Sequence, residues 1–173
     1  MSYSKLSQNH INYFINILGN ENVIYDQDIR NYSSDHTEDL VYLPEIVLFP
    51  ETTNQVSEIV SYCNENFIPI TPSAALTGLS GGALPIYGGV SLSTKKMNKL
   101  IEINTKNFQA TVEPGLINED FQNELERHDL FYPPDPASKG SCTIGGNIAL
   151  NAGGPRAVKY GVTSNYILNL EIV

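Results

Sequence analysis

The sequence predicts an α+β fold made of two small lobes. Apolar runs of strand length at residues 45–49 and 67–71 flank a segment with helical periodicity, and this order predicts a parallel βαβ unit as the first lobe. A second lobe with a mixed sheet is predicted to begin near Gly88. Its strand-like runs are residues 89–93, 100–103 and 108–112.

The chain is predicted to start with a helix and an irregular lead-in, residues 1–39, followed by the main domain, residues 40–173. The first helix keeps one apolar face, and Gly19 is placed to end it. The residues of that face are Leu6, Ile11, Phe14, Ile15 and Leu18.

The helix of the βαβ unit has its own start signal. Pro50 ends the strand before it, and Thr52 with Gln55 three residues later resembles a capping box. Its apolar stripe consists of Val56, Ile59, Val60 and Cys63. The strand that follows leads directly into a glycine-rich segment, at the end of a parallel sheet where ligands of α/β folds commonly bind.

In the second half, the turn-like residues 104–107 predict that the strands around them pair as a hairpin. A helix is predicted from about Asn118, because apolar residues repeat there at helical spacing. Residues 130–132 and 168–173 are further predicted strands. The last strand would leave an unpaired sheet edge, and since such edges pair with other chains we expect a homodimer.

The 173 residues carry 10 Lys and Arg against 19 Asp and Glu, a formal net charge of −9. This balance argues against nucleic-acid or anionic-membrane partners, which need clustered basic side chains. No run approaches the roughly 20 apolar residues of a membrane span, and the first residues lack the apolar run of a signal peptide. Two cysteines and three scattered histidines predict neither a disulfide framework nor a metal site. We therefore expect a cytoplasmic protein.

All but two of the 13 glycines fall in two clusters, between Gly78 and Gly89 and between Gly140 and Gly161. The segment that carries the start of the first cluster runs from Thr71 to Ala83. A turn rich in small residues after a parallel strand can aim successive backbone N–H groups into one concavity, which binds phosphate without basic side chains. Thr77 and Ser80 would add hydroxyl donors. The residues leave open the alternative of a tight turn between closely packed elements.

The second segment runs from Pro133 to Gly154, and its small residues would let a flat ligand lie on the backbone. If Gly146 opens a helical turn, the amides of Asn147 and Asn151 share a face and can donate to a ring carbonyl. The alternative is a buried core segment rich in turns. Cys142 within it is predicted to be a packed thiol.

Several long motifs occur between Tyr32 and Val173 in a characteristic order. They are Pro44–Pro50 with Thr53 and Val56, Thr77–Ala83, Ala110–Gly115, Pro133–Pro136, Gly145–Asn147 through Gly153–Pro155, and Lys159–Val162. In these residues the chain resembles the PCMH-type FAD-binding domain of the vanillyl-alcohol-oxidase-like flavoproteins. Within that family it is most similar to the branch of D-lactate dehydrogenases and glycolate oxidase subunits.

The resemblance implies FAD between the two lobes and an oxidoreductase that moves a hydride from a small 2-hydroxy acid, D-lactate or glycolate, to the flavin. The first glycine segment matches the family's pyrophosphate loop, the second matches the flavin bed, and the chain's end matches the adenine side. The cofactor-binding residues that it implies are Ser73, Ala74, Ala75, Leu76, Thr77, Gly78, Ser80, Gly81, Pro134, Asp135, Ser141, Thr143, Ile144, Gly145, Gly146, Asn147, Ala149, Asn151, Gly153 and Val173. It implies no catalytic residue and no metal ligand in this chain.

The chain departs from the family in two respects. Ser73, Ala74 and Leu76 replace the Arg and both Gly of the family's Pro-Arg-Gly-x-Gly-Thr, and a positive φ at Leu76 would cost roughly 1–2 kcal/mol. The family's FAD domain also continues past this length, and a substrate domain with the catalytic His follows. We therefore expect a C-terminally incomplete FAD-binding portion, with a second chain carrying the substrate domain as a partner. The alternative is a non-catalytic, truncated or split module that needs that chain for activity.

Overall fold

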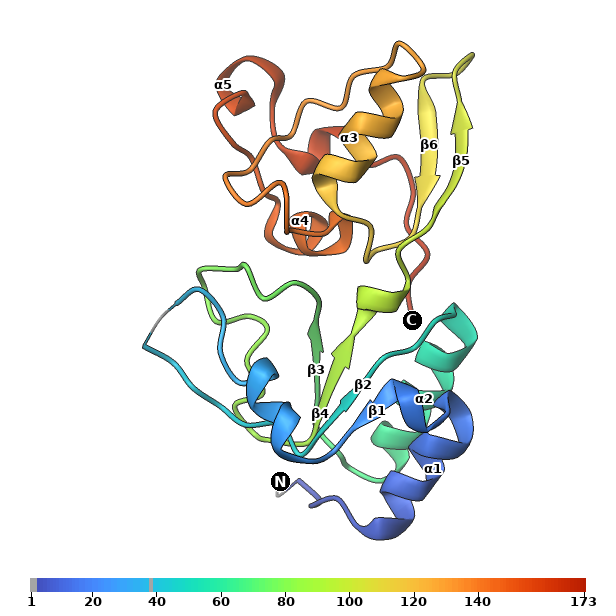
Figure 1. Cartoon of the computed structure of the whole chain (residues 1–173), viewed down its shortest axis with the longest axis vertical. Helices are drawn as coiled ribbons and strands as arrows, with labels where there is room; N and C mark the ends of the chain where they lie inside the picture. Colours follow the sequence, from blue (N-terminus) through green and yellow to red (C-terminus); the bar gives the residue numbers. More distant parts are fainter. Residues whose placement is uncertain (1–2, 38) are drawn as a thin grey trace. The chain divides into compact units, whose positions relative to one another are not determined.

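The computed structural model describes residues 3–37 and 39–173, which form two compact units (Figure 1). The first unit extends to Lys96 and includes Val173, and the second comprises residues 97–172. The α+β architecture of two small units is confirmed. The boundary between them lies at Lys96 and Met97 instead of near Gly88, because the strand that follows Gly89 belongs to the first sheet.

The first unit is built on a four-stranded sheet in the order β1-β2-β4-β3. Its strands are β1 (Val23–Ile24), β2 (Ile46–Leu48), β3 (Ile70–Ser73) and β4 (Val90–Ser93). β4 pairs in parallel with both β2 and β3, whereas β1 is antiparallel to β2. The predicted βαβ unit is therefore present, with β4 inserted between its two strands. Residues 89–93 were expected in the second lobe, and that placement is wrong.

Two helices, α1 (Gln8–Leu18) and α2 (Thr53–Glu65), pack on one face of this sheet (Figure 1). The core between them contains Phe14 and Ile59 from the helices and Val90 and Leu92 from β4, all buried. Val90 and Leu92 face this core, and the alternating Ser91 and Ser93 are also buried, on the other face of the sheet. This shared core is the physical reason why β4 joins the first unit.

The predicted ends of these helices are confirmed, except that the second bond of the capping box goes to Glu51 N–H instead of Thr52 N–H. Thr52 Oγ1 accepts a hydrogen bond from the backbone N–H of Gln55 at 3.2 Å, and the Gln55 side chain accepts from Glu51 N–H at 2.8 Å. Gly19 ends α1 with a φ of +81°. The described residues also contain the 3₁₀ segments η1 (Asn20–Asn22), η2 (Gln27–Tyr32), η3 (Thr94–Lys96) and η4 (Thr163–Tyr166).

The second unit holds the predicted hairpin and three helices. Strands β5 (Leu100–Asn104) and β6 (Gln109–Val112) pair in antiparallel fashion. The helices are α3 (Asn118–Glu126), α4 (Ile144–Leu150) and α5 (Ala157–Tyr160). Phe121 and Leu125 of α3 form a core with Tyr132 and Ile144. Among the described residues, every helix is too short or too polar to pass through a membrane.

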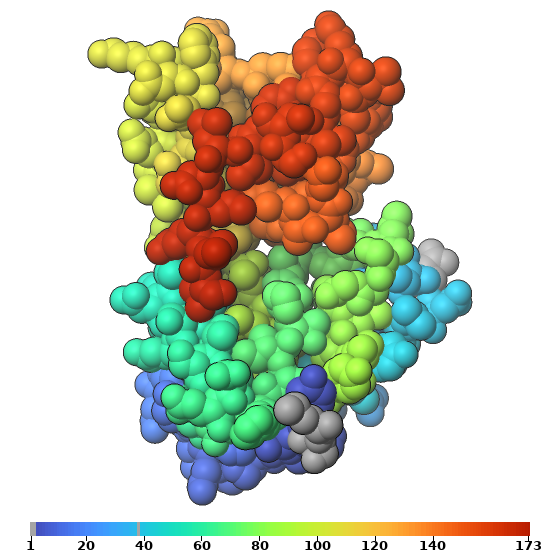
Figure 2. Space-filling model, turned by 180° about the vertical axis from the view of Figure 1, so that it is seen from behind, coloured from blue at the N-terminus to red at the C-terminus, as the bar shows by residue number. Residues whose placement is uncertain are grey.

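Two predicted strands are absent. Residues 130–132 have no strand partner, since Leu130 N–H donates to the Leu125 carbonyl and the Tyr132 carbonyl accepts from Gln122. Residues 168–173 also pair with no strand of the described chain, and the side chains of Leu168, Leu170 and Ile172 are exposed. Figure 2 shows this last segment, in red, on the molecular surface. The expected homodimer rested on that strand and loses its physical basis.

Glu45, at the start of β2, ties the segment before α1 to the sheet. Its carboxylate accepts hydrogen bonds from Leu6 N–H at 2.9 Å, from Lys5 Nζ at 3.1 Å and from Gly89 N–H at 3.3 Å. Burial alone would raise the pKa of this carboxyl, but the donors outweigh burial and hold the pKa below its ordinary value.

Because the pKa of Glu45 is lowered by folding, its contribution to stability is present above the ordinary carboxyl pKa and is lost as the pH falls through the folded value. We expect Glu45→Gln to lower the free energy of unfolding by about 1 kcal/mol at pH 7. Urea denaturation at pH 7 and pH 3 measures this cost. A difference that stays the same at pH 3 would contradict the assignment.

Candidate functional site

The first glycine segment is part of the connection between β3 and β4. These strands are parallel neighbours, so the chain must return along the sheet, and residues 74–89 do so without helix or strand (Figure 1). The backbone N–H groups of residues 75–83 donate no hydrogen bond to any residue that the structure describes. Neighbouring amides without an internal acceptor are the donors that an anion-binding nest requires.

The glycines of this connection have two different roles. At Gly89 a Cβ atom would lie 2.3 Å from the Pro69 carbonyl oxygen, so close packing requires glycine there. At Gly82 a Cβ atom would meet nothing within 4 Å, and at Gly81 only ordinary contacts begin, at 3.5 Å. Close packing therefore does not explain Gly82, and between the two interpretations of the sequence this favours the approach of a ligand.

The altered positions of the loop differ in their consequences. Leu76 has a φ of +58°, so the condition for strain at this position is met, and the left-handed conformation costs roughly 1–2 kcal/mol. Ala74 is not among the described residues with positive φ, and alanine is unstrained there. The buried Ser73 hydroxyl bonds the Ser91 hydroxyl at 3.0 Å, which directs that side chain into the sheet. Ser73 can therefore offer a ligand its backbone only.

In the second segment, two of the predicted residues serve the fold. The Asp135 carboxylate accepts a hydrogen bond from the Arg156 backbone N–H at 3.2 Å and forms an ion pair with Arg156 Nε, also at 3.2 Å. At Gly154 a Cβ atom would lie 2.2 Å from the Asp135 carbonyl oxygen. Gly145 donates its N–H to the Pro114 carbonyl at 2.8 Å and has no room for a Cβ atom beside that proline.

The amides of Asn147 and Asn151 do not converge, and that expectation is wrong. A helical turn does form, because Thr143 caps α4 by accepting from Gly146 N–H at 3.2 Å. Asn147 is buried and donates to Asn118 Oδ1 at 3.0 Å. Asn151 ends α4 in the left-handed conformation, φ +49°, and its side chain accepts from Ser164 N–H at 2.9 Å. The reversal of the backbone at Asn151 separates the two side chains.

The remaining predicted residues divide by exposure. Pro134, Thr143 and Ile144 are buried, whereas Ser141, Ala149 and Val173 are exposed. The Ser141 hydroxyl is directed at the Ser138 carbonyl, 3.2 Å away. Ala75, Thr77, Gly78, Gly146 and Gly153 are half-buried, and Ser80 is exposed. Cys142 is a buried free thiol, as predicted.

Sequence reasoning missed a buried amide pair on α3. Gln122 Nε2 donates to the carbonyls of Tyr132 and Pro134, each at 2.9 Å, and Asn118 Nδ2 donates to Pro134 at 3.3 Å. The signal was available, since two amides spaced four apart share the helix face of Phe121 and Leu125. Burial raises the pKa of the adjoining Tyr132 phenol to about 12, and the nearby Thr163 hydroxyl opposes part of that rise.

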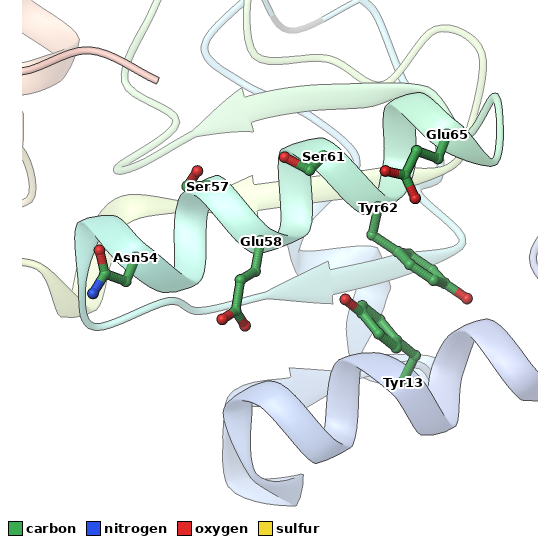
Figure 3. A pocket seen from close by; sticks show the side chains of 7 residues that line it. All are labelled: Tyr13, Asn54, Ser57, Glu58, Ser61, Tyr62 and Glu65. Atoms are coloured by element: carbon green, nitrogen blue, oxygen red, sulfur yellow. The ribbon is translucent and has the colours of Figure 1, made fainter.

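A surface groove of about 370 Å³ lies elsewhere, between α1 and α2 of the first unit (Figure 3). It is lined by Tyr13, Asn54, Ser57, Glu58, Ser61, Tyr62 and Glu65. The rings of Tyr13 and Tyr62 stack at 3.7 Å between centroids. None of the predicted cofactor-binding residues lines it. Nowhere in residues 3–37 and 39–173 do three potential metal ligands cluster.

Known proteins share both the sequence and the fold. The chain is 45% identical over 142 residues to the glycolate oxidase subunit GlcD of Bacillus subtilis (strain 168), covering 82% of this chain and 30% of the relative. It is 40% identical over 174 residues to the D-lactate dehydrogenase of Anaerostipes hadrus, covering 99% and 36%. The chain thus spans about a third of the length of these relatives.

Among solved structures, the chain superposes on an alkyldihydroxyacetonephosphate synthase with a TM-score of 0.84 at 18% identity, over 95% of this chain and 36% of that one. A p-cresol methylhydroxylase gives 0.72 at 27% identity, over 87% and 31%. The first of these likenesses shows the fold alone. Residues 44–173 match the family described as "FAD binding domain", and the chain therefore belongs to this family of FAD-binding domains.

Proposed function

We propose that residues 75–83 hold the pyrophosphate of FAD through their backbone N–H groups, with the hydroxyls of Thr77 and Ser80 as further donors. The observation that carries this proposal is the run of amides without an internal acceptor, beside an open Gly82. Residues 73–89 include no charged side chain, so backbone dipoles would supply the positive potential. An acidic protein can bind a diphosphate in this way.

The isoalloxazine ring is assigned to the second segment, residues 134–154. Its small side chains support this part of the proposal. Asp135 and Asn147 would act here by holding the backbone, since their side chains are engaged within the protein. Val173 is assigned to the adenine side on the family resemblance.

The reaction that we propose for the complete enzyme is the oxidation of a small 2-hydroxy acid. Relatives named glycolate oxidase subunit, D-lactate dehydrogenase and probable D-2-hydroxyglutarate dehydrogenase support this substrate class. Bound FAD supplies the hydride acceptor. The residues of this chain would bind and orient the cofactor, and the groups that activate the substrate would come from polypeptide beyond the matched third.

A second polypeptide that corresponds to the unmatched part of these relatives is a proposed partner. Exposed apolar side chains on two neighbouring loops of the first unit support it, since exposed apolar patches mark interaction sites. They are Leu40, Val41, Leu43, Leu79, Ile86 and Tyr87. A hydrogen bond from His36 N–H to the Gly78 carbonyl joins the two loops. The cytoplasmic location stays a prediction.

Titration of the purified chain with FAD tests the proposed function. We expect quenching of flavin fluorescence that saturates at one FAD per chain, and competition by ADP, which shares the diphosphate. Riboflavin lacks the phosphates and should compete more weakly. A chain that binds no FAD at saturating concentration would overturn the proposal.

Leu76→Gly removes the left-handed strain and should raise the free energy of unfolding by about 0.5–1 kcal/mol, the strain relieved less the entropy cost of glycine. It should also tighten FAD binding about two- to fivefold, because the loop is then in its binding conformation in a larger fraction of the molecules. Ala74→Gly is the matched control, since φ is not positive there, and should destabilise by about 0.5–1 kcal/mol. Equal effects of the two changes would contradict the strain assigned to Leu76.

Catalysis is tested by complementation. FAD-loaded chain alone should not be bleached by D-lactate or glycolate. We then add the part of the Bacillus subtilis relative that lies after its matched region, and the flavin should now be bleached. Absorbance near the flavin maximum measures this bleaching. Bleaching without the added fragment would refute the need for a second polypeptide.

A further inference from the structure

The stretch from Tyr132 to Pro136 crosses the second unit as extended chain without a strand partner. Three of its five residues are prolines, which carry a carbonyl but no N–H. Such a stretch has more acceptors than donors, and Tyr132 and Pro134 are buried. Buried carbonyls need donors from elsewhere in the protein.

Side chains of α3 supply those donors. Gln122 Nε2 bonds the carbonyls of Tyr132 and Pro134 at 2.9 Å each, and Asn118 Nδ2 adds a second donor to Pro134 at 3.3 Å. Both amides are buried, with exposed fractions of 8% and 0%. One helix face therefore takes the place of the neighbouring strand that this stretch lacks.

Asn118 also reaches the other parts of the flavin-holding segment. Its Oδ1 accepts from Asn147 Nδ2 of α4 at 3.0 Å, and its backbone N–H donates to the Cys142 carbonyl at 3.0 Å. The next residue, Glu119, donates its N–H to the Lys139 carbonyl at 3.0 Å. The start of α3 is thus bonded to the segment at four places along its length.

We propose that Asn118 and Gln122 are positioning residues that hold residues 132–147 in the conformation that receives the flavin. They act through the carbonyls and the Asn147 amide that they bond, without touching the cofactor. The inference rests on the proposed function, and it adds which residues set the affinity of the second segment. A segment held before binding spares the ligand the entropy cost of ordering it.

Variants on two sides of α3 test the role of this amide pair. Gln122→Met keeps the length of the side chain and removes both donated bonds, and Asn118→Leu removes the other donor. Asn123→Leu is the matched control, an amide lost from the exposed side of the same helix. We expect either buried variant to weaken FAD binding at least about tenfold, because buried carbonyls lose their donors, and the control to leave it unchanged.

Hydrogen exchange separates positioning from general stability. In the folded variants, exchange should accelerate in residues 137–147 and stay unchanged in the hairpin β5–β6. Wild-type affinity in a folded Gln122→Met variant, or acceleration through the whole second unit, would overturn the proposal.

Wild-type protein gives a test that does not depend on any variant folding. The amides of residues 137–147 should already be protected from exchange without FAD, because the segment is held by α3. Protection that arises only on adding FAD would refute positioning by the amide pair. If wild-type protein binds no FAD, the proposed function fails and the affinity role fails with it. Binding by the wild type with no loss in the variants overturns the further inference alone.

Discussion

Parallel pairing of β3 with β4 is the constraint on which the first part of the site depends. Two parallel neighbours cannot be joined by a tight turn, because the chain must travel back to the edge where the first strand began. Residues 74–89 make this return without a helix, and the amides of residues 75–83 have no acceptor among the described residues. The strand order requires this return connection, and its lack of a helix leaves a run of amides without an acceptor among the described residues.

The second unit has a surplus of hydrogen-bond acceptors, and donors from within the same unit satisfy them. Its proline-rich stretch has surplus acceptors, and buried amides of α3 satisfy them. The two units are therefore suited to different tasks. The first has backbone donors that could bind an anion. The second has a surface of small residues, held in place by α3, whose polar groups are already paired. Under the proposed function, the diphosphate of FAD would use the first of these surfaces and its flat ring system the second.

Local patterns predicted the helices α1, α2 and α3, the hairpin and the two glycine segments, because each depends on residues close in the chain. The short helix α5 was not predicted. β4 was assigned to the wrong unit, since its parallel partners are separated from it in sequence and no local pattern encodes that pairing. Residues 168–173 alternate as a strand should, but a strand also needs a neighbour to bond. The prediction that the Asn147 and Asn151 amides share a helix face is wrong because the helix ends at Asn151, which is in the left-handed conformation. Motif resemblance predicts the site segments, and that assignment stays a prediction. It does not reveal which side chains are buried and bonded within the protein.

Leu76 has a consequence for the lifetime of the protein in the cell. A strain of about 1–2 kcal/mol raises the population of locally opened loops by about five- to thirtyfold. Degradation by proteases tracks such open forms when opening and closing are fast. A ligand bound to the same loop depletes them by mass action. The turnover of this chain would then follow the supply of its cofactor, so that protein without cofactor is removed first.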